Sequence, residues 1–217
     1  MDQWAHGRQP MADAIDGQEF WDERFATEDY VFGTQPNAFL VREAHRLEPG
    51  SRVLAVADGE GRNSVFLAKH GHKVVATDIS ERALEKADRL AAKSGVEIQF
   101  VQTDLASWAW PENAFDAVVA IFIQFSAPQV RERIFEDISK TLKPGGLLLL
   151  EGYRPEQLAF GTGGPPSAEN MYTEAMLREA FGALEIELLE GYDAEISEGK
   201  GHPGMSALID LIARRPS

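Results

Sequence analysis

Residues 52–63 read RVLAVADGEGRN, and this stretch decides the fold. The apolar run Arg52–Ala57 predicts a strand that is buried on both faces, as in a parallel sheet. The G-E-G triplet then turns the chain into a helix expected over Asn63–His70, and such a turn lets a ligand approach the backbone closely. The dinucleotide fingerprint G-x-G-x-x-G fails, because its third glycine is Ser64. At this point a ligand-binding turn and a plain strand-to-helix connection are both open.

Downstream, apolar runs alternate with amphipathic stretches, which is the pattern of parallel βαβ units. Two further strands near the end lack a helical pattern between them and therefore should pair antiparallel. We predict a doubly wound, Rossmann-like α/β sheet of seven strands, mostly parallel, with an antiparallel C-terminal strand. The later strands are expected at Lys73–Asp78, around Val96–Phe100 as a half-exposed edge, and at Asp116–Phe122, Leu147–Gly152, Glu185–Tyr192 and Ser206–Ala213; the later helices are expected between Ser80 and Gly95, over Gln129–Leu142 and after Thr173.

Composition limits the classes of partner. The 217 residues suit one domain, and the absence of cysteine excludes disulfides and fits a reducing cytoplasm. Acidic residues outnumber basic ones 35 to 21, giving a formal net charge of −14. Nucleic-acid binders need a basic face, so we expect no nucleic acid as partner. No apolar run is long enough to span a bilayer, and we expect no membrane partner.

Two carboxylates follow the next two predicted strands. Asp78 ends the second strand about twenty residues after the glycine turn, where a carboxylate accepts hydrogen bonds from the ribose of an adenosine ligand. The alternative is a carboxylate that only favours the following helix N-terminus. Asp104, followed by Leu105, closes the third strand, where it is suited to an adenine amine or simply begins a loop.

Taken in order, VLAVADGEGRNSVFLA, VVATDIS, FVQTDL, FDAVVAIF and LKPGGLLLLEGY resemble the motifs of class I methyltransferases that use S-adenosylmethionine (SAM). The upstream WDERFATEDYVFGTQPNAFL resembles the N-terminal segment of the tellurite-resistance and thiopurine methyltransferase branch, which folds over the cofactor. The resemblance implies one domain with strand order 3-2-1-4-5-7-6. Residues 17–45 would cover the cofactor, residues 50–217 would form the core, and residues 1–16 are expected to be flexible.

The resemblance implies a site for SAM and its demethylated product S-adenosylhomocysteine (SAH). Ala57, Gly59 and Gly61 would lie along the methionine part. Asp78 would hold the ribose, and Asp104 with Leu105 the adenine. The remaining cofactor-binding positions that the resemblance implies are Ala120 and Phe122 beside the sulfonium, Tyr30 and Gly33 in the cover, and Asn63 and Ile79.

The chain departs from the family pattern at the glycine turn. The acidic residue usually found two positions before the first glycine is Ala55, and the first glycine itself is Ala57. The carboxylate that helps hold the methionine ammonium is therefore missing from its usual place. Asp58 or Glu60 are the candidates to replace it.

Methyl transfer from a sulfonium needs alignment more than acid–base chemistry, and alignment alone can contribute about 7–11 kcal/mol. For an oxygen or nitrogen nucleophile a nearby base adds roughly 10²–10⁴-fold in rate. No catalytic residue is identified, and the candidates are Gln124, Tyr153 and His202. The run 160–166, FGTGGPP, is either a lid with glycine hinges or a rigid connection.

The sequence thus predicts a cytoplasmic SAM-dependent methyltransferase, monomeric or homodimeric, acting on a small-molecule acceptor such as a thiol, a chalcogen oxyanion or a small metabolite. One alternative is a catalytically weak protein that binds SAM or SAH. The other is a nicotinamide-dependent oxidoreductase, which the failed fingerprint and the terminal hairpin disfavour. Histidines and carboxylates are too scattered for a metal-ligand spacing, so no metal is expected.

Overall fold

The computed structural model describes residues 17–199 and 202–217, with only the backbone at 202 and 203; the expectation for residues 1–16 lies outside the described residues. Within this part the strands form one seven-stranded sheet, in the order β3-β2-β1-β4-β5-β7-β6, which confirms the predicted architecture. The strands are β1 (Arg52–Ala55), β2 (Lys73–Asp78), β3 (Gln99–Gln102), β4 (Phe115–Ile121), β5 (Leu142–Tyr153), β6 (Glu185–Glu198) and β7 (His202–Arg214).

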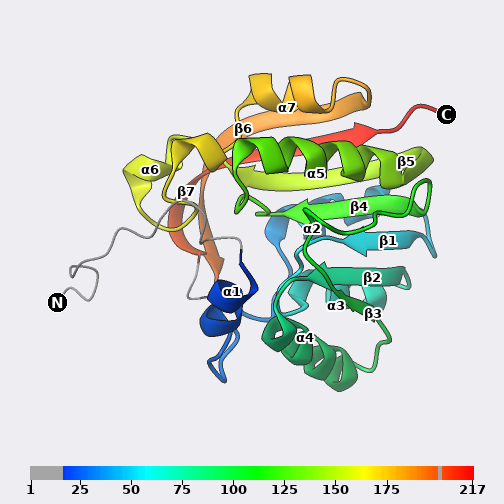
Figure 1. Ribbon diagram of the computed structural model, residues 1–217, viewed down its shortest axis with the longest axis vertical. Coiled ribbons are helices and arrows are strands. Elements are labelled where there is room, and N and C mark those ends of the chain that lie inside the picture. Colours follow the sequence, from blue (N-terminus) through cyan, green and yellow to red (C-terminus); the bar gives the residue numbers. More distant parts are fainter. Residues whose placement is uncertain (1–16, 200–201) are drawn as a thin grey trace.

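The sheet is parallel from β3 to β5 and antiparallel at β7 and β6. β1 lies between β2 and β4. The strand order therefore reverses at β1: β2 and β3 lie on one side of it, and β4 and β5 lie on the other. The carboxyl ends of the five parallel strands therefore meet at one edge of the sheet, where ligands of such folds bind. β7 runs antiparallel to both β5 and β6. Figure 1 shows the parallel strands ending on the side where α1 lies.

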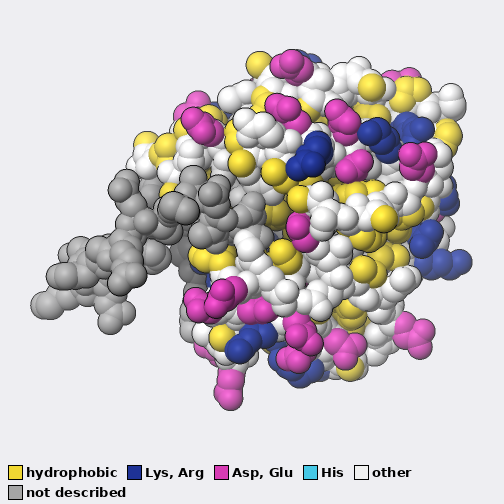
Figure 2. Space-filling model, viewed as in Figure 1, with side chains coloured by type: hydrophobic (Ala, Val, Ile, Leu, Met, Phe, Trp, Pro, Cys, Tyr) yellow, Lys and Arg dark blue, Asp and Glu magenta, His cyan; other side chains and the backbone are white. Residues whose placement is uncertain are grey.

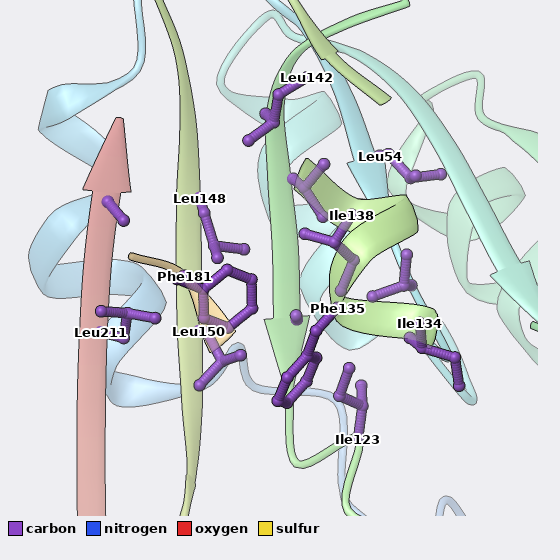
Figure 3. Close-up of a cluster of buried hydrophobic side chains, with 14 of the residues drawn as sticks. Leu54, Ile123, Ile134, Phe135, Ile138, Leu142, Leu148, Leu150, Phe181 and Leu211 are labelled. Atoms are coloured by element: carbon purple, nitrogen blue, oxygen red, sulfur yellow. The ribbon is translucent and has the colours of Figure 1, made fainter. Parts of the chain in front are cut away.

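Helices cover both faces of the sheet. The α-helices are α1 (Gln18–Arg24), α2 (Ala38–Glu43), α3 (Arg62–Lys69), α4 (Glu81–Ser94), α5 (Pro128–Thr141), α6 (Gln157–Phe160) and α7 (Glu174–Ala180), and short 3-10 helices occupy Ala44–Arg46 and Ala168–Asn170. On one face α5 and α7 bury Phe135 and Phe181 against the sheet, as Figure 3 shows for Phe135 beside the strand leucines. On the other face α2 and α3 bury Phe39, Leu40 and Leu67.

The terminal hairpin is longer than the sequence indicates. The stretch expected as a loop after Tyr192 continues as strand to Glu198, and β7 begins at His202 rather than Ser206. The predicted strand bounds leave His202 in the connection between the two strands, and this placement is wrong, because His202 is the first residue of β7. The acidic and small residues at the end of β6 have the composition of a loop. The strand nevertheless continues there, with exposed and half-buried residues alternating, because β6 pairs with β7 up to Glu198.

The other boundaries shift by small amounts. β3 begins at Gln99, so Val96 and Ile98 precede the strand, although β3 is the expected half-exposed edge. Ser80 caps α4 as predicted, because its hydroxyl accepts a hydrogen bond from the Ala83 N–H. None of the helices in the described ranges is long and apolar enough to cross a bilayer. On the face drawn in Figure 2, basic side chains lie scattered among acidic ones.

Candidate functional site

The turn between β1 and α3 is held in a conformation that requires glycine. Gly61 has φ +88°, and a Cβ there would lie 2.7 Å from the Cβ of Ala87 in α4. Gly61 therefore allows α4 to pack directly against the turn. Ala57 also has a positive φ of +47°, at the position where the family pattern has a glycine.

Gly59 and Asp78 meet at the carboxyl ends of β1 and β2. The Gly59 N–H donates to Oδ2 of Asp78 at 2.8 Å, and the Ser80 N–H donates to Oδ1 at 2.9 Å. Asp78 is buried, and burial raises its pKa to about 6 although these N–H groups lower it. The Ile79 N–H is a third backbone donor to this carboxylate, which leaves one of its four lone-pair sites for a further donor.

Asp104 lies beside this pair but points to solvent. The Thr103 N–H donates to the backbone carbonyl of Asp78 at 2.9 Å, which brings the end of β3 next to the end of β2. The Asp104 carboxylate is exposed and accepts from the Ala106 N–H, while Leu105 is buried. The three expected strand ends thus converge.

Two side chains of opposite charge flank the glycine turn with unsatisfied polar atoms. Oδ2 of Asp58 and Nη1 of Arg62 are enclosed, and neither has a hydrogen-bond partner. Burial is the main cause that raises the pKa of Asp58 to about 7; hydrogen bonds from Ser64 oppose it, and the charge of Asp78 adds to it. Buried polar groups are normally satisfied, so these two atoms indicate partners that the chain does not supply. Asp58 is a candidate from the sequence, whereas Arg62 has no sequence signal beyond its place after the turn.

The segment before α2 packs directly on this edge of the sheet. Phe25 is buried, and its ring lies 3.6 Å from where a Cβ of Gly59 would be. Trp21 stacks on Phe25 with ring centroids 5.8 Å apart. The Asp22 carboxylate accepts from the Ser80 hydroxyl at 2.6 Å. The cover therefore closes over the glycine turn.

Lys86 of α4 fastens the same cover. Its ammonium forms a buried ion pair with Glu60 and donates to the backbone carbonyls of Thr27 and Asp29. The Tyr30 hydroxyl donates to the Lys86 carbonyl at 3.1 Å. Glu60 is thus occupied, because Oε1 pairs with the Lys86 ammonium and Oε2 accepts from the Phe32 N–H, whereas Oδ2 of Asp58 has neither kind of partner.

Two hollows are open to solvent near this edge. One of about 550 Å³ lies along α1 and is lined by Gln18, Glu19, Asp22, Glu23, Ala26 and Arg82. The other, of about 250 Å³, lies between the segment Phe32–Ala38 and the end of β6. Gly59, Asp78 and Asp104 line neither of them. The Phe25 ring instead lies against Gly59.

The other expected residues serve the packing around the site. Ala120 is fully buried in the core, Phe122 stacks on Tyr153 with centroids 4.6 Å apart, and Gly33 packs against Gly199. Oδ1 of Asn63 accepts from the Asn37 N–H, which ties α3 to the start of α2. Ile79 is half-buried.

Two of the three catalytic candidates, Gln124 and Tyr153, also serve the packing of the fold. The Gln124 amide is used twice with the Tyr153 backbone, donating to its carbonyl at 2.8 Å and accepting from its N–H at 2.5 Å. Tyr153 is buried with Met171 and Leu208. The side chain of His202 lies outside the described residues. The run 160–166 is tied down, because the Gln157 amide donates to Thr162 and to the Gly163 carbonyl.

Comparisons with known proteins agree with this geometry. The family model of a methyltransferase domain matches residues 53–146. A sterol 24-C-methyltransferase of Gibberella zeae is 32% identical over 136 residues, which are 58% of this chain and 36% of the relative. A demethylmenaquinone methyltransferase of Clavibacter sepedonicus is 34% identical over 101 residues, which are 46% of this chain and 40% of the relative. The chain thus spans well under half the length of these two curated relatives.

Solved structures share the fold at low identity. The chain from a study of the conversion of a disulfide bond into a thioacetal group during echinomycin biosynthesis superposes with a TM-score of 0.74 at 17% identity, covering 92% of both chains. TehB from Haemophilus influenzae superposes with a TM-score of 0.68 at 17% identity, covering 91% of this chain and 66% of that one. Residues 53–146 thus match the family model of a methyltransferase domain, and the chain shares its fold with these solved structures.

Proposed function

We propose that this protein transfers a methyl group from SAM to a small-molecule acceptor. The observation that carries the proposal is the pair of unsatisfied charges at the glycine turn, Oδ2 of Asp58 and Nη1 of Arg62, next to the buried carboxylate of Asp78. The methionine part of SAM has an ammonium and a carboxylate on one carbon. An acid and a guanidinium four residues apart on one turn suit these two groups.

The donor set fits the rest of the cofactor as well. The buried Asp78 carboxylate retains a lone-pair site for a ribose hydroxyl, and Asp104 with Leu105 follows at the neighbouring strand end. The cluster is also acidic overall, which suits a ligand that carries a sulfonium. Asp58 takes over the role that the usual acid has in the family, at a position three residues later than Ala55.

Bound SAM supplies a methyl group on a positively charged sulfur. The residues of this chain would hold the ligand, orient it and enclose it. Asp58, Arg62 and Asp78 would fix the two ends of the ligand, so that the methyl carbon keeps one orientation. Phe25 and Trp21 would exclude water from above. We also propose that the protein is related to the tellurite-resistance branch of these enzymes. The fold that it shares with TehB supports this relation.

A second candidate is a protein that binds SAM or SAH without turnover. The cover favours it, since Phe25 packs on Gly59 and the cover must shift before a ligand reaches the turn. A tightly closed cover slows both loading and product release. Transfer of label from methyl-labelled SAM to a panel of a thiol, an amine and an oxyanion distinguishes the two candidates, since only an enzyme labels an acceptor.

Thermal unfolding tests the proposal first. A ligand at about 100 times its dissociation constant adds roughly 2.7 kcal/mol to the free energy of unfolding. We expect SAM and SAH to raise the melting temperature and NADH to leave it unchanged. A rise with NADH alone would replace the proposal by the oxidoreductase alternative.

A further inference from the structure

The guanidinium of Arg62 is buried but only partly paired. Its Nη2 atom forms an ion pair with Oε2 of Glu198 at 2.6 Å, while its Nη1 atom is enclosed and has no hydrogen-bond partner among the described residues. Arg62 is 7% exposed and Glu198 is 9% exposed. A guanidinium presents its donors as a rigid fork, so one nitrogen can be held while another stays available. Nη1 therefore indicates a partner that the described chain does not supply.

The charge of Arg62 lies between the glycine turn and the far end of the terminal hairpin. Arg62 is the first residue of α3, directly after the turn, and Glu198 is the last residue of β6. Burial raises the pKa of Asp58 to about 7, and the charge of Arg62 is among the effects that oppose this rise. Burial, followed by the charges of Asp210 and Glu198, raises the pKa of Glu151, and the charge of Arg62 opposes that rise too. Arg62 thus acts on carboxylates of both the turn and the sheet.

Glu198 is held in place by its other oxygen. Oε1 accepts from the Asn37 side-chain amide at 3.0 Å and from the Ala38 N–H at 3.2 Å, so the carboxylate is tied to the start of α2. The next residue, Gly199, has φ +68°, and a Cβ there would collide with the backbone of Phe32. The end of β6 therefore packs directly on the segment before α2, and the Glu198 carboxylate is a fixed support for Arg62.

Asp58 is a competing partner for the Arg62 guanidinium. Its Oδ2 atom is also enclosed without a hydrogen-bond partner in the part of the chain that the structure describes. A buried acid and a buried guanidinium that each lack a partner gain stability by pairing with one another. They do not pair here, and Glu198 engages the guanidinium instead. The hold of Glu198 thus leaves one acidic oxygen and one guanidinium nitrogen unpaired together.

We propose that Glu198 is a positioning residue for the methyl donor, holding the Arg62 guanidinium so that Nη1 stays available to the carboxylate of the methionine part. This inference rests on the proposed function and extends it, because the end of the terminal hairpin becomes part of the cofactor site. Glu198 acts through Arg62 and does not itself contact the ligand. In Figure 1 the end of β6 lies on the side of the sheet where α1 lies.

Calorimetry with three ligands that cannot react tests the positioning role. SAH carries both the ammonium and the carboxylate, its decarboxylated form keeps only the ammonium, and 5′-methylthioadenosine lacks both. The wild-type protein should bind SAH at least about tenfold more tightly than the decarboxylated form, because an ion-paired hydrogen bond to Nη1 is lost.

Glu198→Gln should remove that preference. Glutamine has a single acceptor oxygen, so it can hold either Arg62 or the start of α2 but not both. We expect SAH to bind at least about tenfold more weakly and the affinities of the other two ligands to stay unchanged. The matched control is Glu195→Gln, an exposed change of the same charge on the same strand, which should leave all three affinities unchanged.

A double-mutant cycle tests whether Glu198 acts through Arg62. Arg62→Lys keeps the charge but replaces the fork by a single ammonium, so it should weaken SAH binding by itself. In the Arg62→Lys background, Glu198→Gln should then change the SAH affinity by less than about twofold. An equal loss of SAH affinity in both backgrounds would overturn the inference.

A second substitution covers the case in which Glu198→Gln does not fold. Glu198→Asp keeps the buried charge but withdraws the carboxylate by one carbon–carbon bond, so we expect SAH to bind at least about threefold more weakly and the decarboxylated form to bind as before. Unchanged SAH affinity in this variant would overturn the inference.

The outcomes separate this inference from the proposed function. Failure of SAH to bind the wild-type protein would reject the proposed function itself. If the wild-type protein binds SAH no more tightly than the decarboxylated form, the positioning role is wrong while the proposed function stands. Equal SAH affinity for the wild-type protein and a folded Glu198→Gln variant, or an equal loss of all three ligands, would also overturn the positioning role.

Discussion

Asp58→Asn should stabilise the protein at alkaline pH while weakening its hold on the cofactor. Burial raises the pKa of Asp58 from 3.8 to about 7, a difference that corresponds to about 4 kcal/mol. The folded state keeps the proton up to pH 7, whereas the unfolded chain loses it near pH 4. Between these values the native state binds more protons, so the stability of the wild-type protein falls as pH rises. Asparagine has no charge to bury, and it keeps an oxygen for the hydrogen bonds from Ser64.

The expected gain in unfolding free energy is near zero at pH 4 and rises to at most about 4 kcal/mol at pH 8. Urea unfolding at both pH values measures it, with the exposed Asp88→Asn as matched control. Calorimetry gives the functional half of the prediction. The variant should bind SAH more weakly but should bind 5′-methylthioadenosine, which lacks the amino-acid end, as well as the wild-type protein does. Equal destabilisation at both pH values, or equal loss of both ligands, would refute the reasoning.

Three further predictions follow from the same edge of the sheet. Asp78→Ala should weaken SAH and 5′-methylthioadenosine alike, by about 10–100-fold, because both carry the ribose; a loss confined to SAH in calorimetry would mean that Asp78 does not hold the ribose. Phe25→Ala should speed SAH association in stopped-flow mixing, since it removes the ring above the glycine turn, and the exposed Phe20→Ala should not; equal rates would show that the cover does not limit entry. Gly61→Ala should cost about 2–5 kcal/mol in urea unfolding, because its φ is +88° and the new Cβ would collide with α4; a loss below about 1 kcal/mol would contradict this packing.

The strands and the antiparallel end of the sheet were predictable because their signals are local, whereas the strand order was implied by the family resemblance. Each parallel strand is an apolar run that ends at a turn, and the lack of a helical pattern before the last strand requires an antiparallel pair. The length of that hairpin was not predictable. Its outer half, Asp193–Glu198, is rich in acidic and small residues, and the strand forms there because it pairs with β7 residue by residue up to Glu198 and His202.

The convergence of Gly59, Asp78 and Asp104 at one edge also follows from the sequence, because parallel strands end together. The role of Arg62 does not follow from the sequence, and neither does the meeting of two buried carboxylates, Glu151 and Glu198. Glu151 stands in an apolar strand, and Glu198 in a stretch that reads as loop, 47 positions away in the chain. Their meeting through Asn37 depends on the packing of α2 on β5 and β6, which no local pattern encodes.

The central claim is that three strand ends hold one adenosine-bearing ligand, and amide NMR during titration with SAH tests it most directly. We predict that the amide signals of Gly59, Asp78 and Leu105 shift together with a single dissociation constant, along with those of the cover around Phe25. Shifts confined to other parts of the sheet, or none at saturating SAH, would contradict the account.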